Sequence, residues 1–491
     1  MGAVTVAEMR EIEGRAMGSG TTEGELMERA GVALGNAIGR QYPQTRAAVA
    51  YIGKGHNSGD ALIALRVLHK DFGWEIAVRS AYPADTWAEL TRRQWDVSGL
   101  ERTLVEPPID RFVGTVLLLD GLLGIGAKGA LREPLAGLAR EMEWLRNTRG
   151  FQVAAVDLPS GVDPDSGEIF PGAVTADRTF MIGEAKRGLL LGCAANSTGA
   201  LALVDVEGLS GEGEDMQVIC PQRMDFGKIP RLFDFHKGKA GRIGILAGSP
   251  EFTGAALIST LGALAAGGGL VTLYSPSSAS DAIRSRLPLE AMCKSCDDPT
   301  ALLSERLDAL VVGPGLGEML GNFEAGVIEL ISSTRVPMVI DADGLNLISK
   351  RQIKTDERHI LTPHPGEFER LAGKMEGQSR EEAAKTFSFA SRSVLLLKGA
   401  RTIVAKRDQS LRINSTGNPG MANGGQGDLL SGVIGALLAQ GMEGFDAASL
   451  GAWLCGRAAE ISVEENGSPS RATDVARKLG IAELDWRGGN R

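Results

Sequence analysis

The feature that most restricts the fold of this sequence is a recurring unit: a short apolar run rich in β-branched residues, a turn, and then a helical stretch. Short runs that alternate with helical segments indicate parallel α/β sheets, in which ligands bind at the carboxyl ends of the strands. In the first half we predict strands at Ala47–Gly53, Glu75–Ser80, Val113–Asp120, Gln152–Asp157, Arg178–Ile182 and Ala200–Val204. In the second half we predict strands at Arg242–Ala247, Gly269–Tyr274, Ala309–Gly313, Met338–Asp341, Val394–Lys398 and Thr402–Ala405.

The chain divides once. Its 491 residues are too many for one ordinary hydrophobic core, so two or three domains are expected. The segment Glu207–Asp215 is polar, acidic and rich in glycine, which is the composition of a linker or an exposed loop. We therefore predict one α/β domain over residues 1–215 and a second over residues 222–491.

Composition excludes several classes of protein. The hydrophobic content of 43% and charged content of 23% are those of a soluble globular protein, and the net charge of −9 argues against a nucleic-acid partner. Five cysteines without a signal-peptide pattern fit the cytoplasm. Cys293-Lys294-Ser295-Cys296 lacks the second pair that a zinc site requires. The apolar run Ala255–Tyr274 contains three successive glycines, so it suits a buried helix turning into a strand better than a membrane span.

The segment Asn418–Asp428 is the strongest functional motif. Its glycines allow positive φ angles and let successive backbone N–H groups face an anion, and the apolar run Leu429–Ile434 behind it reads as a buried helix whose positive end faces the same anion. A carboxylate in that place, Asp428, repels phosphate but can act as a base on a neighbouring hydroxyl. The alternative is a glycine-rich turn in which Asp428 caps the helix.

Three loops of the first half also follow predicted strands. Gly53–Asp60 is a glycine-rich phosphate cradle without a Walker lysine, and we expect the helix Ala61–Lys70 after it. Gly124–Gly129 satisfies the GxGxxG pattern without opening a long helix, and Val156–Asp163 exposes Asp157 and Ser160. Each loop alone could be a tight turn, but three of them favour one shared site.

These loops resemble the N-terminal YjeF domain, the NAD(P)H-hydrate epimerase, whose pattern is Gly-x-Gly-Asn-Asn-Gly-Gly-Asp, a strand-end Asp, and Asp-x-Pro-Ser-Gly. The similarity covers most of residues 1–205, with departures at His56, Ser58 and Ala61. It implies a Rossmann-like three-layer domain with a potassium ion on Asn57, Asp120 and Ser160, and a catalytic Asp157 at the damaged ring. It implies an epimerase substrate site made of His56, Asn57, Ser58, Gly59, Asp60, Gly124, Ile125, Gly126, Ala127, Lys128, Gly129, Ala130 and Asp157.

Ordered motifs of the second half are similar to the NAD(P)H-hydrate dehydratase of the ribokinase-like superfamily, over residues 230 to about 460. These motifs are Phe235–Gly241, Ala247–Ser249 with Thr253–Ala256, Val312–Gly317, Ile340–Asn346, Leu361–Phe368 and Leu397–Thr402. The resemblance implies a hydrate pocket of Ala255, Gly315, His364 and the catalytic Asp428. It implies an adenine-nucleotide site of Lys398, Gly399, Ala400, Arg401, Thr402, Asn418, Gly424, Gly425 and Gly427.

The two resemblances together imply a bifunctional repair enzyme for NADH and NADPH hydrates. The first domain interconverts the two epimers with K⁺. The second uses ADP or ATP with Mg²⁺ to remove water, and fused members of the family favour ADP. The resemblance also implies a homo-oligomer. Two other readings stay open: a ribokinase-like kinase for a sugar or vitamin precursor, and a non-catalytic nucleotide-binding scaffold.

Overall fold

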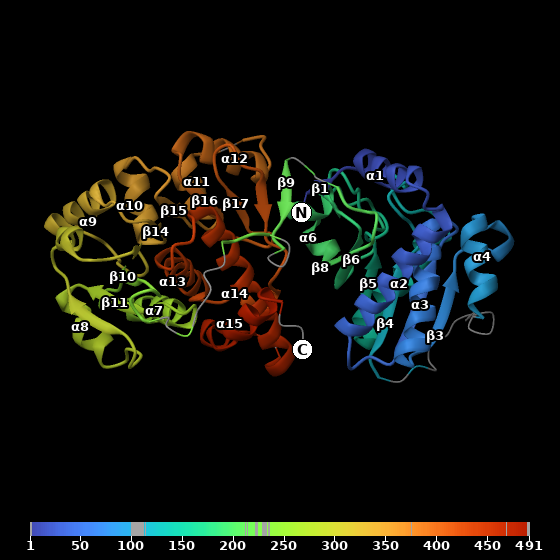
Figure 1. Cartoon of the computed structure of the whole chain (residues 1–491), viewed down its shortest axis with the longest axis horizontal. Coiled ribbons are helices and arrows are strands. Elements are labelled where there is room, and N and C mark those ends of the chain that lie inside the picture. Colours follow the sequence, from blue (N-terminus) through green and yellow to red (C-terminus); the bar gives the residue numbers. More distant parts are fainter. Residues whose placement is uncertain are drawn as a thin grey trace. The chain divides into compact units, whose positions relative to one another are not determined.

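The computed structural model describes residues 2–99, 112, 114–211, 213, 215–220, 224–227, 233, 236–374, 376–467 and 469–488. The chain forms two compact units, Met1–Val218 (unit 1) and Ile219–Arg491 (unit 2), and each is described by itself (Figure 1).

Unit 1 is built on six parallel strands in the order β3-β2-β4-β5-β6-β8. They are β2 (Ala47–Ile52), β3 (Glu75–Ser80), β4 (Val116–Gly121), β5 (Gln152–Val156), β6 (Arg178–Ile182) and β8 (Ala200–Val204). The short strands β1 (Ala3–Val4) and β7 (Ala185–Lys186) form a separate parallel pair, and β9 (Met216–Val218) ends the unit.

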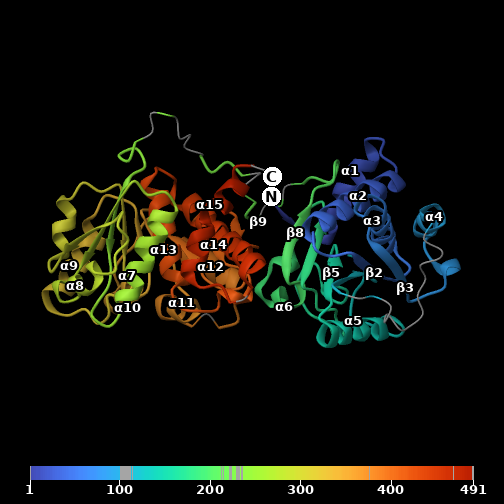
Figure 2. The same ribbon diagram turned by 90° about the horizontal axis from the view of Figure 1, so that it is seen from below.

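Helices cover both faces of this sheet. The helices are α1 (Val6–Gly18), α2 (Glu23–Gln41), α3 (His56–Phe72), α4 (Glu89–Ser98), α5 (Leu135–Arg149) and α6 (Ala195–Thr198), with 3₁₀ turns η1 (Ala84–Thr86), η4 (Arg187–Leu190) and η5 (Gly192–Ala194). Alternate residues of β2 point to opposite sides, as a strand requires: Ala48 and Ala50 pack with α1–α3, whereas Val49 and Tyr51 pack with α5 (Figure 2). Unit 1 is therefore a three-layer α/β domain.

Unit 2 contains a longer sheet in which β12, β11, β10, β13, β14, β15, β16, β17 and β18 lie in that order. The strands are β10 (Arg242–Leu246), β11 (Leu270–Ser275), β12 (Met292–Ser295), β13 (Ala309–Val312), β14 (Met338–Ile340), β15 (His359–Leu361), β16 (Val394–Leu397), β17 (Ile403–Ala405) and β18 (Leu411–Ile413). Strands β10–β16 are parallel, and β17 and β18 are antiparallel to their neighbours.

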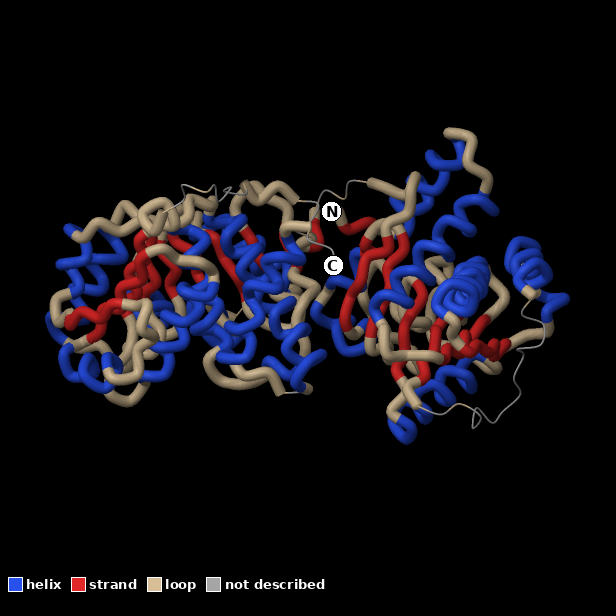
Figure 3. The backbone as a smooth tube through the Cα atoms, turned by 60° about the horizontal axis from the view of Figure 1, so that its bottom comes forward, coloured by secondary structure: helices blue, strands red, loops and turns tan. Residues whose placement is uncertain are grey.

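One side of the unit 2 sheet holds its main core. The helices of the unit are α7 (Thr253–Ala265), α8 (Ser277–Arg284), α9 (Gly321–Ser333), α10 (Asp343–Arg351), α11 (Pro365–Ala372), α12 (Arg380–Ser391), α13 (Gln426–Ala439), α14 (Gly444–Asn466) and α15 (Ala472–Trp486), with 3₁₀ turns η6 (Pro299–Ser304) and η7 (Pro419–Met421). Helices α7, α13, α14 and α15 bury their apolar residues together, and the strands run between helical layers (Figure 3). A Cβ atom on Gly432 would lie 1.9 Å from the Ser259 carbonyl oxygen, so this glycine permits the close approach of α13 to α7.

Every predicted strand has a counterpart, and the run Ala255–Tyr274 is indeed a helix, α7, that leads into β11. The start of α3 was predicted wrongly. The helix begins at His56, not at Ala61, so residues His56–Asp60 form its first turns instead of a loop. No helix in the described part of the chain combines the length and hydropathy of a membrane span.

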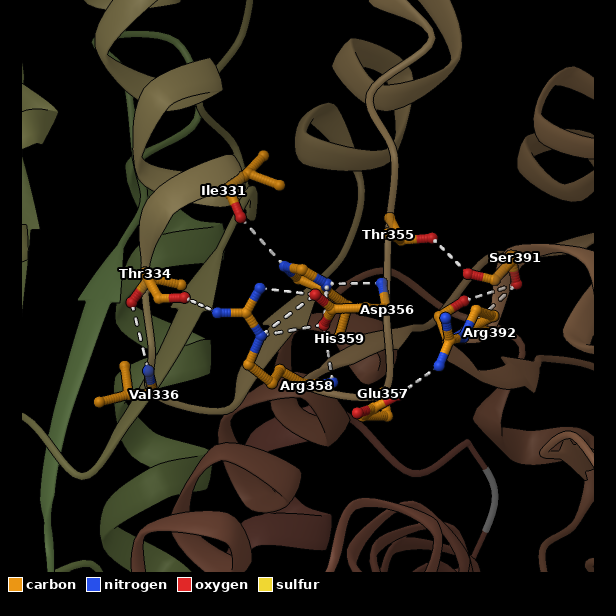
Figure 4. Close-up of polar contacts among 11 residues, drawn as sticks. Ile331, Thr334, Val336, Thr355, Asp356, Glu357, Arg358, His359, Ser391 and Arg392 are labelled. Carbon is orange, nitrogen blue, oxygen red and sulfur yellow. Dashed lines mark hydrogen bonds and ion pairs between the residues drawn. The ribbon is translucent and has the colours of Figure 1, made fainter.

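The amino-terminal end of β15 carries a polar network (Figure 4). His359 is 1% exposed; its Nδ1 accepts the Asp356 N–H at 3.1 Å, and its Nε2 lies 3.1 Å from the Ile331 carbonyl oxygen. The ring is therefore neutral, with its proton on Nε2. Arg358 pairs with Asp356 and donates to the Thr334 carbonyl, which ties the loop before β15 to the end of α9. This network lies at the end of the strands opposite to the predicted site.

Candidate active sites

Both sheets contain a topological switch point. In unit 1, β2 lies between β3 and β4; in unit 2, β10 lies between β11 and β13. Consecutive connections leave such a strand in opposite directions, and the crevice between the loops at its carboxyl end is where open α/β sheets bind ligands. In unit 1 the predicted site residues follow β2, β4 and β5, next to this point, except Asp120, which lies within β4; in unit 2 they follow β10 and β13 at this point and also β15, β16 and β18 farther along the sheet.

In unit 1 the carboxyl ends of β4 and β5 bring Asp120 and Ser160 together. Asp120 accepts hydrogen bonds from the Ser160 backbone N–H and from the Ser160 hydroxyl, both at 2.7 Å. The Ser160 hydroxyl in turn accepts the Leu123 N–H at 3.0 Å, and Asn57 Nδ2 donates to the Leu123 carbonyl at 2.8 Å. The structure thus collects Asn57, Asp120 and Ser160 around Leu123.

Burial raises the pKa of Asp120 to about 6, although the hydrogen bonds from Ser160 and Leu122 oppose that rise. A cation beside this carboxylate would restore its usual acidity. The cluster offers side-chain and backbone oxygens, which are the ligands of a hard cation. The donor chemistry of these residues therefore fits a potassium ion.

Ser58, which departs from the epimerase pattern, is fully buried and does not face the pocket. Its hydroxyl donates to the Gly121 carbonyl and accepts the Gly53 N–H, both at 3.0 Å, so it ties the ends of β2 and β4 together. His56, the other departure in this loop, is half-exposed and its Nδ1 lies 3.2 Å from Glu23. Neither substitution closes the site.

Beside this cluster lies a pocket of about 140 Å³. Its lining consists of Met9, Glu13, Met17, Glu23, Leu26, Met27, Ala30, His56, Asp60, Asp157, Ile182, Lys186 and Leu209. A Cβ atom on Gly59 would lie 2.6 Å from the Met27 sulfur, so this glycine gives α2 room against α3. The structure therefore brings His56, Asp60 and Asp157 of the predicted substrate site into one cavity. Of the predicted Gly124–Ala130 loop, Gly124 lies against Asn57, and its remaining residues form a partly exposed turn.

Asp157 has a left-handed backbone, with φ of +67°, which is uncommon outside glycine and concentrates at functional sites. Its carboxylate is held by Lys186, a side chain that is 1% exposed and that also donates to the Ile182 carbonyl at 2.7 Å. The left-handed backbone of Asp157 and its ion pair with a buried lysine therefore make this end of the pocket a candidate for chemistry.

In unit 2 a second paired lysine, Lys398, directly follows β16; its side chain is partly buried and its ammonium lies close to Gly427 of α13. Lys398 Nζ is 2.8 Å from Asp341 Oδ1 and 3.8 Å from Glu367 Oε2, and Ser431 donates to Asp341 Oδ2 at 2.6 Å. A Cβ atom on Gly427 would lie 3.1 Å from the Lys398 ammonium, so the absence of a side chain there keeps the lysine in place.

Asp428 faces this cluster from the first turn of α13. Burial raises its pKa to about 6, with further contributions from Asp341, Asp343 and Glu367, whereas Lys398 lowers it. The helix N-cap is Gly425, so the alternative that Asp428 caps the helix is wrong. Within the described residues no side chain or backbone group donates a hydrogen bond to the Asp428 carboxylate, which leaves it available to a ligand.

His364 is the N-cap of α11, in a stiff loop between two prolines. Its Nδ1 accepts the N–H groups of Gly366 and Glu367 at 3.0 and 3.3 Å, so the ring proton sits on Nε2, 3.5 Å from Glu367 Oε1. The predicted neighbours Ala255 and Gly315 also meet: a Cβ atom on Gly315 would lie 2.8 Å from that of Ala255. Gly315, with φ of +61°, thus forms a floor beside the start of α7.

The predicted nucleotide loop follows β16. Gly399 has φ of +152°, and the Arg380 guanidinium lies so close that a Cβ atom there would be 2.7 Å from it. Arg401 is 8% exposed, and burial lowers its pKa to about 10; Thr402 donates to the Gly399 carbonyl at 3.1 Å, and Ala400 is exposed.

The second part of that site is the turn before α13. Asn418 caps η7 through its Oδ1, and its buried Nδ2 has no partner within the described residues. Gly425 has φ of +91°, and Gly424 beside it has open space around a Cβ position. Asn423 and Gln426 both donate to the Ser470 carbonyl at 2.8 Å, which anchors the turn to the segment before α15.

Comparisons with known proteins follow the same division. The profile of the YjeF-related N-terminal domain matches residues 23–188, and that of NAD(P)H-hydrate dehydratase matches residues 243–480. A bifunctional NAD(P)H-hydrate repair enzyme Nnr of Gloeobacter violaceus is 35% identical over 94% of this chain and 95% of its own length. The chain belongs to this family. The Nnr enzyme of Escherichia coli K12 is also 35% identical, over 94% of this chain and 89% of its own.

A solved structure of a ribokinase-like superfamily protein from Enterococcus faecalis matches 55% of this chain and 96% of its own, at 23% identity and a TM-score of 0.50. That likeness concerns the fold. The expected family and the expected fold, a YjeF-type α/β domain followed by a ribokinase-like α/β domain, are therefore confirmed.

Sequence reasoning missed several polar residues of these two Nnr-type sites. Glu13, Lys186, Asp341, Glu367 and Arg380 all lie in or beside them, but none was predicted as a site residue. Asp341 and Glu367 stand inside quoted motifs and so carried a signal. Glu13 lies on a helix before the matched range, and only the fold brings it to the pocket.

Proposed function

We propose that this chain repairs hydrated NADH and NADPH, with unit 2 as the dehydratase and unit 1 as the epimerase. The observation that carries the proposal is Asp428, a carboxylate without hydrogen-bond donors in the described structure, with a pKa of about 6, at the positive end of α13. A base with a pKa close to neutrality at an anion-binding helix end suits proton removal beside a phosphoryl group.

In unit 2, Asp428 takes the proton of the hydrate's hydroxyl, and the oxygen attacks the terminal phosphoryl group of the nucleotide. The resulting phosphate ester is a better leaving group than hydroxide. The carbon–oxygen bond then breaks with loss of a proton from the adjacent ring carbon, which releases orthophosphate and restores the double bond of the cofactor. Ala255 and Gly315, which meet at the switch point, would position the ring for this step together with His364 on the loop after β15.

The adenine nucleotide would lie along Lys398–Thr402 and the turn Asn418–Gly427. Positive φ angles at Gly399 and Gly425 support this assignment, because such turns expose backbone N–H groups to phosphates. We favour ADP as the donor. Mg²⁺ would enter with the nucleotide and neutralise phosphate charge, since this ion needs few protein ligands when phosphates bind it.

In unit 1, Asn57, Asp120 and Ser160 would hold K⁺, Gly124–Ala130 would cradle the phosphates, and Asp157 would contact the hydrated ring. The oxygen donors around Leu123 and the raised pKa of Asp120 support the cation. Residues His56–Asp60 add the first turns of α3, whose N-terminus favours an anion. We also propose a cytoplasmic location, which the cysteine content favours, and self-association, which the family resemblance implies.

The test is recovery of the near-ultraviolet absorbance of reduced nicotinamide from NADH hydrate with ADP, ATP or neither. We expect recovery with a nucleotide, one orthophosphate released for each hydrate repaired. A stable phosphorylated product would favour the kinase alternative, and nucleotide binding without turnover would favour a scaffold. Supplying the R epimer alone tests unit 1, because its repair beyond the spontaneous rate requires interconversion.

A further inference from the structure

The pocket of unit 1 holds more ionisable side chains than the binding of a neutral ring requires. Apolar side chains from α1 and α2 form much of its lining. Six ionisable side chains also line it: Glu13, Glu23, His56, Asp60, Asp157 and Lys186. His56 and Glu23 pair with each other at its rim, where both are about half-exposed. The remaining four side chains need an explanation.

Lys186 and Asp157 form an ion pair in the interior. Asp157 Oδ1 accepts both from Lys186 and, at 2.9 Å, from the Ile182 N–H. Asp157 Oδ2 has no donor among the described residues, so one carboxylate oxygen remains open to a ligand. Among the described residues, Lys186 has no ion-pair partner other than Asp157.

The side chains of Asp60 and Glu13 form no hydrogen bond within the described structure, although both line the pocket. Burial raises the pKa of Asp60 well above its usual value, and the negative charges of Asp157 and Glu13 add to the rise, whereas Lys186 opposes it. Glu13 faces Lys186, Asp157, Arg10 and Glu23, and its pKa is also raised, chiefly by burial. Asp60 thus keeps a proton at a pH where an exposed aspartate has lost it.

Epimerisation of a 6-hydroxy hydrate needs such a proton. The carbon that bears the hydroxyl is bonded to the ring nitrogen. When an acid protonates the hydroxyl, the carbon–oxygen bond breaks, water leaves and the nitrogen lone pair forms a carbon–nitrogen double bond. Water then adds to the other face, the electron pair returns to nitrogen, and the proton of the added water goes back to the carboxylate. No oxidant or reductant is required, and the planar cation between the two steps is stabilised by a nearby negative charge.

We propose that Asp60 is the general acid–base of the epimerase and that Lys186 is a positioning residue that holds the Asp157 carboxylate against the cationic ring. Glu13 is, after Asp157, the second negatively charged neighbour that favours the protonated form of Asp60. This assignment rests on the proposed epimerase function, and it deepens that function by naming the group that moves the proton.

The first test is Asp60→Asn in the full chain. Asparagine matches aspartate in size but cannot donate the carboxyl proton, so the enzyme-dependent interconversion should fall by about 100-fold or more. Dehydration of the S hydrate in the same preparation should be unchanged. Asp71→Asn, at an exposed position on the same helix, is the matched control and should keep both activities.

The second test follows the alkaline limb of the pH–rate profile, where protonated Asp60 is lost. Glu13→Gln removes a negative neighbour, so this limb should move to lower pH; Lys186→Met removes a positive one, so it should move to higher pH. Residues that only support the fold would not shift the limb in opposite directions. Glu11→Gln, exposed on α1, is the control for Glu13.

Wild-type protein that does not accelerate interconversion would refute the epimerase function itself. If the wild type is active, two results would overturn only the assignment of Asp60. One is an interconversion rate of Asp60→Asn within a few-fold of wild type; the other is an alkaline limb that stays in place in both Glu13→Gln and Lys186→Met. If Asp60→Asn does not fold, the two limb shifts decide the question alone.

Discussion

The Lys398 ammonium lies 2.8 Å from the Asp341 carboxylate, and this pair separates the ionisation of two neighbouring aspartates. Burial would raise the pKa of Asp341, but Lys398 and the Ser431 hydroxyl outweigh it and lower that pKa. Burial and the negative charge of Asp341 instead raise the pKa of Asp428 to about 6. Two carboxylates whose environments push their pKa values apart suit different roles: a fixed counter-ion and a base.

Lys398→Met should therefore change both the pH dependence and the stability of unit 2. Without the cation the pKa of Asp428 rises, so the acidic limb of dehydration should move to higher pH. Loss of the ion pair also leaves the buried Asp341 charge unpaired, which costs about 3–5 kcal/mol of unfolding free energy. Lys406→Met, which breaks an exposed pair with Glu443, is the control and should cost at most about 1 kcal/mol. An unshifted limb would contradict the coupling between Lys398 and Asp428.

The His359 network in Figure 4 predicts a pH-dependent stability that is separate from catalysis. Burial lowers the pKa of His359, so near pH 6 the unfolded chain binds a proton that the folded chain excludes. The unfolding free energy of unit 2 should thus fall as the pH drops below about 6.5, and level off below the folded pKa. His359→Gln should show a smaller fall between about pH 8 and 5 in denaturant titrations. His236→Gln, at an exposed position, should behave like wild type.

The sequence predicted the alternation of strands and helices because apolar runs and turn residues are local signals. It did not predict β1, β7, β9, β12, β15 and β18, which are two to four residues long and, for β12, largely exposed. It placed the start of α3 five residues late, because Gly55 serves as N-cap without a side-chain signal and His56–Asp60 read as a loop.

The candidate site residues, too, were predicted only where the local sequence carried a signal. Residues on glycine-rich loops, such as Asp428 and Asp120, stood out because each follows a strand or precedes a helix. Glu13 did not, since nothing near it in the sequence resembles a motif; Lys186 belongs to the segment Lys186–Gly188 that the family resemblance covers, but no local feature indicated a role for its side chain. Their proximity to Asp157 depends on β6, β7 and α1 meeting in space, and no local pattern encodes that meeting.

We expect the units to fold independently. Unit 2 draws its core from residues from Ile219 onward, and the cores of unit 1 come from residues up to Leu209. A shortened chain beginning at Met216 should give a cooperative melting transition and dehydrate the S hydrate without unit 1. Insoluble or inactive protein, under conditions in which the whole chain works, would show that this boundary or the independence is wrong.

Asp120→Ala should slow epimerisation and leave dehydration of the S hydrate unchanged. It removes the carboxylate to which Ser160 donates two hydrogen bonds and which the proposed K⁺ would contact. The rate of interconversion, corrected for the spontaneous reaction, is measured with and without K⁺; wild type should depend on the ion and the variant should not. Asp96→Ala, exposed on α4, is the control. A parallel loss of both activities, or equal wild-type rates without K⁺, would count against the cation site.

Asp428→Asn is the sharpest test of unit 2. Asparagine keeps the size of the side chain but cannot accept a proton at neutral pH, so dehydration should slow by at least about 100-fold. Nucleotide affinity should stay constant or increase, because a negative charge beside the phosphates is removed. In the wild type, the rate should also fall as the pH drops through about 6 and Asp428 becomes protonated.

The same substitution should stabilise the protein, and this distinguishes a base from a structural residue. The folded-state pKa of about 6 lies above the unfolded value of 3.8, so ionisation of Asp428 opposes folding at neutral pH. The neutral amide of the Asp428→Asn variant avoids that cost, and the gain of about 3 kcal/mol should be complete above pH 6 and absent below the unfolded pKa. A purely structural role of Asp428 predicts unchanged or reduced stability with nearly normal turnover. Denaturant unfolding and the dehydration rate, measured on one preparation at two pH values, decide between them: turnover within a few-fold of wild type would end the assignment of Asp428 as the base.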